Sequence, residues 1–338
     1  MALYYAPAFF FYLLASCIWG ADGGSKNVLT DGTIYRRWSG VVGRVLSLGV
    51  VVALTFAALW GPFCIASPIA DGGGCLSSLG QVLLRLFPFS RGLFEDKVAN
   101  LWFCLDVTLK LRKKLAVPQL AKLALATTLS LLVPVGAELL RPARPLTARR
   151  LVLALFNSSL AFFLCSFQVH EKSLLLPLCP LGFLWQDSPL FVTWIQVVGM
   201  FSMTPLLGRE GLLIPCAVCT VLYVGASAVL ALSSEGNVSG SGNTAFPYGR
   251  HVTQGRLRIM AALSVAGMLA LLSLEATLPP PKALPHIHPT LNALFSCGNL
   301  TVAYGLGVYW QWRHGDCFGD DVSEQRRRPR GAELKKDR

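Results

Sequence analysis

A short charged segment at residues 167–173 lies between two long apolar runs and carries residue types suited to phosphate chemistry. His170 titrates near neutral pH, so its ring can donate a hydrogen bond to a phosphate or act as an acid or base. Lys172 can offset phosphate charge, and Glu171 can orient either neighbour. Because polar groups at a membrane boundary are costly to desolvate, such a segment either serves a site or faces lipid headgroups.

A second charged stretch, residues 85–102, adds two cations and a helical pattern. Arg85 and Arg91 can clamp an anionic group bidentately. The spacing after Gly92 predicts an amphipathic helix lying in the membrane interface. Its apolar face is Phe94, Val98, Leu101, Trp102 and Leu105, and its polar face is Glu95, Asp96, Ala99 and Asn100. The alternative is a solvated amphipathic connector. If the helix does lie in the interface, the cations beside it indicate an amphiphilic ligand whose phosphate lies at the interface.

Other potential ligands do not form a metal site in the sequence. Ten Cys are scattered along the chain. Cys216 and Cys219 form a C-x-x-C inside an apolar run without a second pair at zinc spacing, which favours small buried thiols. His286 and His288 lie in a Pro-rich loop, and two ligands are too few for a typical zinc site. The sequence contains neither a P-loop nor a G-x-G-x-x-G turn.

The composition places these residues in a membrane protein. Of 338 residues, 53% are hydrophobic and 14% are charged, against about 25% charged in soluble domains. Runs long enough to cross a bilayer predict about nine spans. They cover residues 2–19, 41–63, 119–140, 151–169, 173–185, 189–207, 211–232, 259–278 and 291–310. The fifth is short, and Pro177 and Pro180 make it a broken or re-entrant element. We therefore expect an all-α polytopic membrane protein.

The positions of Lys and Arg predict the orientation of the chain. The net charge is +12, and most cations outside the spans fall in loops 20–40, 141–150 and 233–258 and in the tail. Short basic loops stay in the cytosol, so this pattern favours membrane orientation over nucleic-acid binding. We expect a multi-span region at 1–312, a long lumenal segment at 64–118 and a disordered cytosolic tail at 313–338. Lys335 and Lys336 resemble a dilysine endoplasmic-reticulum signal, although lysines are common in basic tails.

An odd number of spans with a cytosolic tail places Met1 in the lumen, at the start of an apolar run. No signal peptide pattern is visible there. Two interpretations follow. The sequence is the later part of a longer chain, or the span count is wrong by one, for instance at 173–185.

Both charged stretches resemble motifs of the dolichyl-phosphate-glucose-dependent alpha-1,3-glucosyltransferases of asparagine-linked glycosylation, which belong to glycosyltransferase family 57. The residues that carry the resemblance are Arg85-Leu-Phe-Pro-Phe-Ser-Arg-Gly-Leu-Phe-Glu-Asp-Lys-Val-Ala-Asn-Leu-Trp-Phe-Cys and Ser166-Phe-Gln-Val-His-Glu-Lys-Ser. The opening Met1-Ala-Leu-Tyr-Tyr-Ala-Pro-Ala-Phe-Phe also looks like an internal stretch of those enzymes. The similarity extends to about residue 310. The run from Arg91 to Asn100 is similar to the branch that adds the first glucose.

The resemblance implies a GT-C type glycosyltransferase fold in the endoplasmic-reticulum membrane. It implies transfer of glucose from dolichyl phosphate glucose to the nine-mannose oligosaccharide on dolichyl diphosphate, in the lumen, with no metal or cofactor. Expected partners are this donor, this acceptor and membrane lipid, with no nucleic acid. The implied donor phosphate site is His170, Lys172, Arg85 and Arg91, supported by Glu171, Glu95 and Asp96.

The general base is not assigned by the resemblance. Family members have further spans before the region similar to Met1, and their first lumenal loop carries an acidic residue suited to deprotonate the acceptor hydroxyl. No residue of this sequence corresponds to that loop, so we expect an amino-terminal truncation. One alternative is a catalytically incomplete isoform or fragment that binds dolichol-linked ligands or partner subunits. Another is a secondary transporter, although no paired half-repeats support it.

Overall fold

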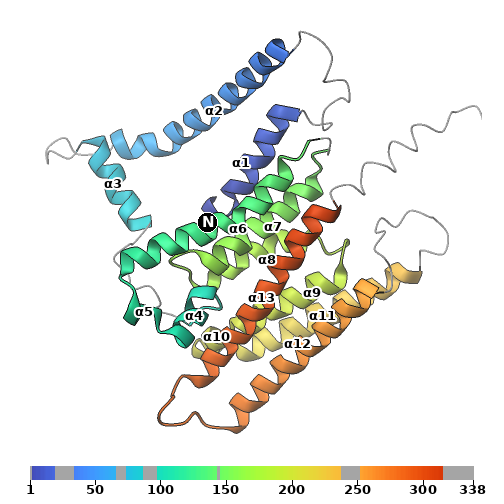
Figure 1. Ribbon diagram of the computed structural model, residues 1–338. Helices are drawn as coiled ribbons and strands as arrows, with labels where there is room; N and C mark the ends of the chain where they lie inside the picture. The colour runs from blue at the N-terminus through green and yellow to red at the C-terminus, as the bar shows by residue number, and fades with distance from the viewer. Residues whose placement is uncertain are drawn as a thin grey trace, which may run out of the picture.

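The computed structural model describes residues 2–19, 34–65, 74–86, 97–142, 145–236 and 252–314. Within these ranges the regular elements are helices and no strand is present, which confirms the predicted all-α class (Figure 1). The elements are α1 (Ala2–Trp19), α2 (Ile34–Ile65), α3 (Cys75–Leu86), α4 (Leu101–Leu109), α5 (Leu111–Lys114), α6 (Val117–Leu139), α7 (Ala148–Cys165), η2 (Glu171–Leu174), α8 (Leu175–Gly182), α9 (Pro189–Ser202), α10 (Thr204–Arg209), α11 (Leu213–Gly236), α12 (Val252–Thr277) and α13 (Ile287–His314).

Five helical segments are long and apolar enough to cross a membrane. They cover Gly40–Ile65, Val117–Leu139, Ala148–Cys165, Leu213–Ser233 and Gly255–Thr277. Leu3–Trp19 and Pro189–Ser202 form shorter apolar helices. The chain is therefore a multi-pass membrane protein. The count of nine spans stays a prediction.

The predicted fifth span is broken, as the prolines indicated. The 3-10 helix η2 leads into α8, and turns follow at residues 183–187. Pro177 lies in the first turn of α8, and Pro180 lies inside it. Eight residues of α-helix extend about 12 Å, well short of the roughly 30 Å hydrocarbon core. The segment instead runs beside α7 as a short helix followed by turns, because Asp187 at its end forms an ion pair with Arg149 at the start of α7.

Helix α7 is the central helix of the bundle. It packs against α1, α6, α8 and α13. In the apolar stretch of α7, 61% of the residues are buried inside the protein, whereas in the apolar stretch of α2 only 6% are buried. Close approach of α13 depends on Gly307, because a Cβ at that position would collide with the side chains of Phe156 and Asn157 of α7. Small residues at helix contacts in membranes permit such close packing.

Helices α2 and α3 lie beside the bundle and not within it (Figure 1). Helix α3 packs against α2, and the Cys64–Cys75 disulfide joins the two. The sequence did not predict this bond. For Cys216 and Cys219, the expectation of free thiols in a helix is confirmed, but burial is wrong because one is half-buried and the other exposed. Their position on the outer surface of α11 exposes them.

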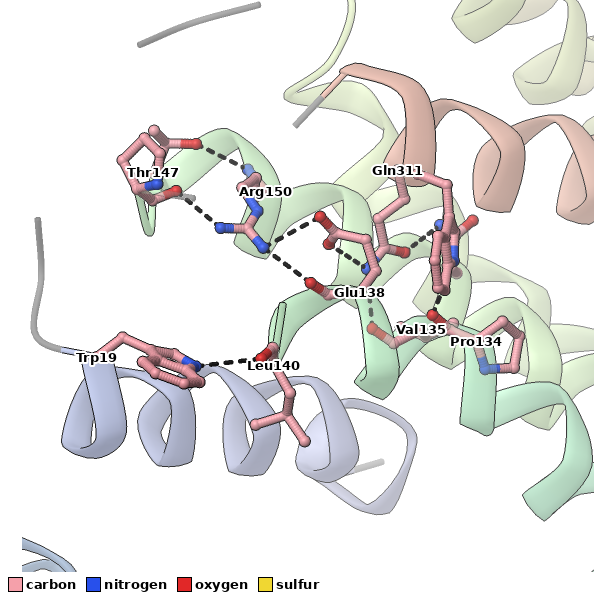
Figure 2. A network of polar contacts seen from close by, with 11 residues as sticks. Trp19, Pro134, Val135, Glu138, Leu140, Thr147, Arg150 and Gln311 are labelled. Atoms are coloured by element: carbon pink, nitrogen blue, oxygen red, sulfur yellow. Dashed lines mark hydrogen bonds and ion pairs between the residues drawn. The ribbon is translucent and has the colours of Figure 1, made fainter. Parts of the chain in front are cut away.

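One end of the bundle is held by a buried polar network, shown in Figure 2. Arg150 donates to Glu138 Oε1 at 3.0 Å, and Gln311 Nε2 donates to Glu138 Oε2 at 3.2 Å. Asn157 donates to Gln311 Oε1 at 2.8 Å. These side chains are all buried and join α6, α7 and α13.

The loop expected at 141–150 is shorter in the structure, because α7 already begins at Ala148. Thr147 caps this helix by accepting a hydrogen bond from Arg150 N at 3.3 Å.

Candidate functional site

The segment that carries His170 lies at the end of α7 opposite this network. Helix α7 ends at Cys165, and residues 166–170 run without helical structure before η2 begins. His170 occupies the N-cap position of η2 with an extended backbone, and its carbonyl accepts from Ser173 N at 2.9 Å. The His170 side chain is exposed. The end of a rigid, buried helix thus presents an imidazole at the bundle surface.

Two ion pairs join this segment to the end of α10. Arg209 Nη2 lies 3.2 Å from Glu171 Oε1, and Lys172 Nζ lies 3.8 Å from Glu210 Oε1. The Glu171 side chain is 13% exposed, whereas the Arg209 side chain is 64% exposed. Glu171 thus forms an ion pair with Arg209, a partner that sequence reasoning missed. The pairing joins residues 38 positions apart, so spacing along the chain could not reveal it.

The start of α13 fixes the position of α10. Asn292 Nδ2 donates to Phe201 O at 2.9 Å and to Thr204 Oγ1 at 3.1 Å, at the junction of α9 and α10. Asn292 is buried. Because α10 is only six residues long, this anchoring determines where Arg209 lies relative to Glu171.

The structure brings the two charged stretches of the sequence together. Trp102 Nε1 donates to Cys165 O at 2.6 Å, immediately before residues 166–173. Val98 and Ala99 belong to the same buried cluster as Cys165 and Leu174. The distant stretches therefore share one packed region at the end of α7.

The expected interfacial helix is wrong in two respects. Residues 97–100 are not helical, and α4 begins only at Leu101. Asn100 caps α4 by accepting from Phe103 N at 2.8 Å, a role that asparagine strongly favours over a helix interior. Ala99 and Asn100, expected on the polar face, are buried, and Trp102 packs inside the protein.

Some of the candidate residues are not brought to this site by the described structure. Arg85 lies in the last turn of α3, which packs against α2, and it is exposed. Arg91, Glu95 and Asp96 lie outside the described residues. Across the described ranges, no group of three or more His, Cys, Asp or Glu side chains could hold a metal ion.

Comparison with known proteins identifies relatives along most of the chain. The model of the ALG6, ALG8 glycosyltransferase family matches residues 1–306. A Drosophila melanogaster protein named "Probable dolichyl pyrophosphate Man9GlcNAc2 alpha-1,3-glucosyltransferase" is 34% identical over 315 residues, covering 92% of this chain and 57% of its own.

Two further relatives carry the same enzyme name without the qualifier. The Gallus gallus protein is 33% identical over 306 residues, covering 88% of this chain and 55% of its own. The Saccharomyces cerevisiae protein is 34% identical over 227 residues, covering 66% of this chain and 37% of its own. The chain spans about half the length of the curated relatives it matches.

Proposed function

The chain belongs to the ALG6, ALG8 glycosyltransferase family, and on that premise we propose that it transfers glucose to a lipid-linked oligosaccharide. The donor is dolichyl phosphate glucose, and the acceptor is the nine-mannose oligosaccharide on dolichyl diphosphate. The reaction takes place on the lumenal side of the endoplasmic-reticulum membrane and adds the first glucose in alpha-1,3 linkage. The names of the relatives support the acceptor and the linkage.

The observation that carries the proposal is the contact between the two charged stretches. Trp102 and Cys165 join a segment similar to the first-glucose branch to the segment that holds His170. Both stretches lie within the residues matched by the family model. A site assembled from them would include the exposed cations at the end of α7 and α10.

The ion pairs around His170 are suited to exchange with a phosphate. The Lys172 side chain is 67% exposed and lies 3.8 Å from Glu210, which is a weak arrangement. Exposed ion pairs contribute about 0–1 kcal/mol, so a donor phosphate can replace Glu210 at little cost. Lys172 and His170 would then offset the charge that develops on dolichyl phosphate as it leaves. Glu171 would hold Arg209 near the same phosphate.

The remaining candidate residues keep supporting roles in the proposal. Arg85 ends α3, while Arg91, Glu95 and Asp96 follow it in the chain before α4. We place them in the lumenal wall of the site. The proposal assigns the general base to no residue of this chain.

The test measures lipid-linked oligosaccharides in cells that lack their own first-glucose transferase. The full open reading frame is expressed, lipids are labelled with radioactive mannose, and the glycans are separated by chromatography. His170→Ala should lower conversion of Man9 to Glc1Man9 by about 10²-fold, as expected for loss of one donor to a developing charge. The matched control is His286→Ala, which changes an exposed histidine in the α12–α13 loop. The control should leave conversion unchanged at equal protein level.

Two outcomes would contradict the proposal. Full conversion by the His170 variant would remove that residue from the site. Lack of conversion by the wild-type chain, at normal abundance and with tight binding of dolichyl phosphate, would instead support a non-catalytic binding component.

A further inference from the structure

A cavity lies at the end of the bundle opposite His170. Its volume is about 700 Å³, and it is lined by residues of α9, α11, α12 and α13, which lie side by side in Figure 1. Its walls are mostly aliphatic and aromatic. The residues that form them include Leu190, Val224, Leu257, Met260, Leu306 and Trp310.

Charged groups line the cavity where α9 and α12 begin. Arg256 and Arg258 are exposed there, and neither has an ion pair with any described residue. Asp187 is the only acidic residue among those that line the cavity, and Arg149 of α7 already forms an ion pair with it. The rim therefore carries an excess of positive charge that these residues do not neutralise.

The cavity combines this cationic rim with an apolar interior that follows the helices. Along α11, its lining extends from Val224 to Ala231, which is about 10 Å of helix. Tyr309 and Trp310 of α13 also line it, and such aromatic residues are enriched where membrane helices meet the headgroup layer. The loops at this end are those that the sequence predicts to be cytosolic. A ligand that satisfies both parts has an anionic head and a hydrocarbon chain.

This cavity cannot share a phosphate with the site around His170. Arg149 lies at the start of α7, and His170 follows its far end. The helix has 18 residues, so the two cationic regions are separated by about 25 Å. A lipid whose phosphate lies at the rim of the cavity therefore does not reach the cations around His170.

We propose that this cavity binds an anionic glycerophospholipid from the cytosolic leaflet. Its phosphate lies at the rim formed by Arg256 and Arg258, and one acyl chain lies between α9 and α11. The proposal is independent of glucosyl transfer, because it concerns a separate region and is measured by binding alone.

The test uses the purified full chain in detergent, stripped of lipid and titrated with dioleoylphosphatidylserine or dioleoylphosphatidylcholine. Native mass spectrometry counts bound lipids. We expect one phosphatidylserine to be retained at concentrations where phosphatidylcholine is lost. The double variant R256Q/R258Q should bind phosphatidylserine about twenty-five-fold more weakly, because each basic residue near an anionic headgroup contributes about fivefold.

Two further variants distinguish charge from cavity filling. K113Q/K114Q removes two exposed cations from α5, far from the cavity, and should leave lipid binding unchanged. Ala228→Trp fills the cavity from the exposed side of α11 without altering charge, so it should displace the lipid. Unchanged melting temperatures of these variants would show that they fold.

Several results would overturn the proposal. Equal retention of both lipids, or equal binding by R256Q/R258Q and wild type, would indicate nonspecific contact with surrounding lipid. Binding of inorganic phosphate as tightly as phosphatidylserine would indicate a free-phosphate site. Complete displacement of phosphatidylserine by dolichyl phosphate at equal concentration would assign the cavity to an isoprenoid lipid.

Discussion

Replacing Glu138 by Gln tests the buried network that joins α6, α7 and α13. The substitution keeps the size of the side chain and an amide oxygen that can still accept from Gln311. It removes the negative charge beside Arg150, whose side chain is only 6% exposed. Arg150 retains backbone acceptors, the carbonyls of Pro145 at 2.8 Å and residue 138 at 3.0 Å. With the amide oxygen accepting from Gln311, the amide NH2 faces the Arg150 guanidinium, so the variant removes both the counter-charge and one acceptor of this buried cation.

The expected cost follows from the burial of both partners. Breaking a buried ion pair from one side costs about 3–5 kcal/mol, because the remaining charge stays desolvated without a counter-charge. In a chain of this size, about 2 °C per kcal/mol gives a fall in melting temperature of roughly 6–10 °C. The double variant E138Q/R150Q leaves no unpaired charge and should recover much of this loss.

The assay heats the detergent-solubilised protein and measures the folded fraction by fluorescence size-exclusion chromatography. Glu275→Gln is the matched control, because Glu275 is exposed in α12 and exposed substitutions usually change stability by less than about 0.5 kcal/mol. A double variant as unstable as the sum of the single variants would refute the argument. So would a single E138Q variant that melts with the wild type.

Three further predictions concern other parts of the fold. Gly307→Ala should destabilise the chain by about 1–3 kcal/mol through overpacking against α7. Gly305→Ala is the control and should not destabilise it, because the space around Gly305 is open. Equal melting temperatures of the two variants would contradict the close approach of α13 to α7. Cys64→Ser should free Cys75 for labelling by polyethylene-glycol maleimide without reductant, and labelling of both cysteines in unreduced wild type would show that the bond is absent. Burial raises the pKa of Asp187 above its ordinary value of 3.8. Its folded form then binds the proton more tightly than the unfolded form, so its contribution to stability is greatest below pH 3.8 and falls as pH rises through the folded pKa. Asp187→Asn should therefore flatten the decline in melting temperature above this pH, and an identical pH profile would refute the shift.

Local patterns predicted much of the helical architecture. The apolar run at residues 2–19 matches α1 in both bounds, although Pro7 lies inside the helix. Pro177 and Pro180 indicated the broken element because proline disrupts helix hydrogen bonding. The sixth predicted span, 189–207, is divided, since α9 ends at Ser202 and α10 begins at Thr204 with Pro205 in its first turn.

Contacts between distant segments were not accessible from these patterns. Arg150 was interpreted as a loop cation that sets orientation, yet it is buried beside Glu138. Both residues lie at predicted span ends, where hydropathy cannot distinguish a solvated charge from a paired one. The same limit applies to Arg209, which meets Glu171 only through the packing of α10. The candidate site could thus be located by its charged segments, but its partners could not be assigned.

The order in which the network is synthesised has a consequence for membrane insertion. Helix α7 has a mean hydropathy of 1.4, against 2.1 for α11, so it enters the bilayer less readily by itself. Its Arg150 and the preceding Glu138 leave the ribosome almost together, and a nascent α6–α7 hairpin can neutralise both charges before release from the translocon. Gln311 lies 173 residues after Glu138, which at about 5–20 residues per second takes roughly 9–35 s to translate. During this interval the hairpin must persist with Asn157 lacking its partner, which makes it the stage of biogenesis most exposed to membrane chaperones and quality control.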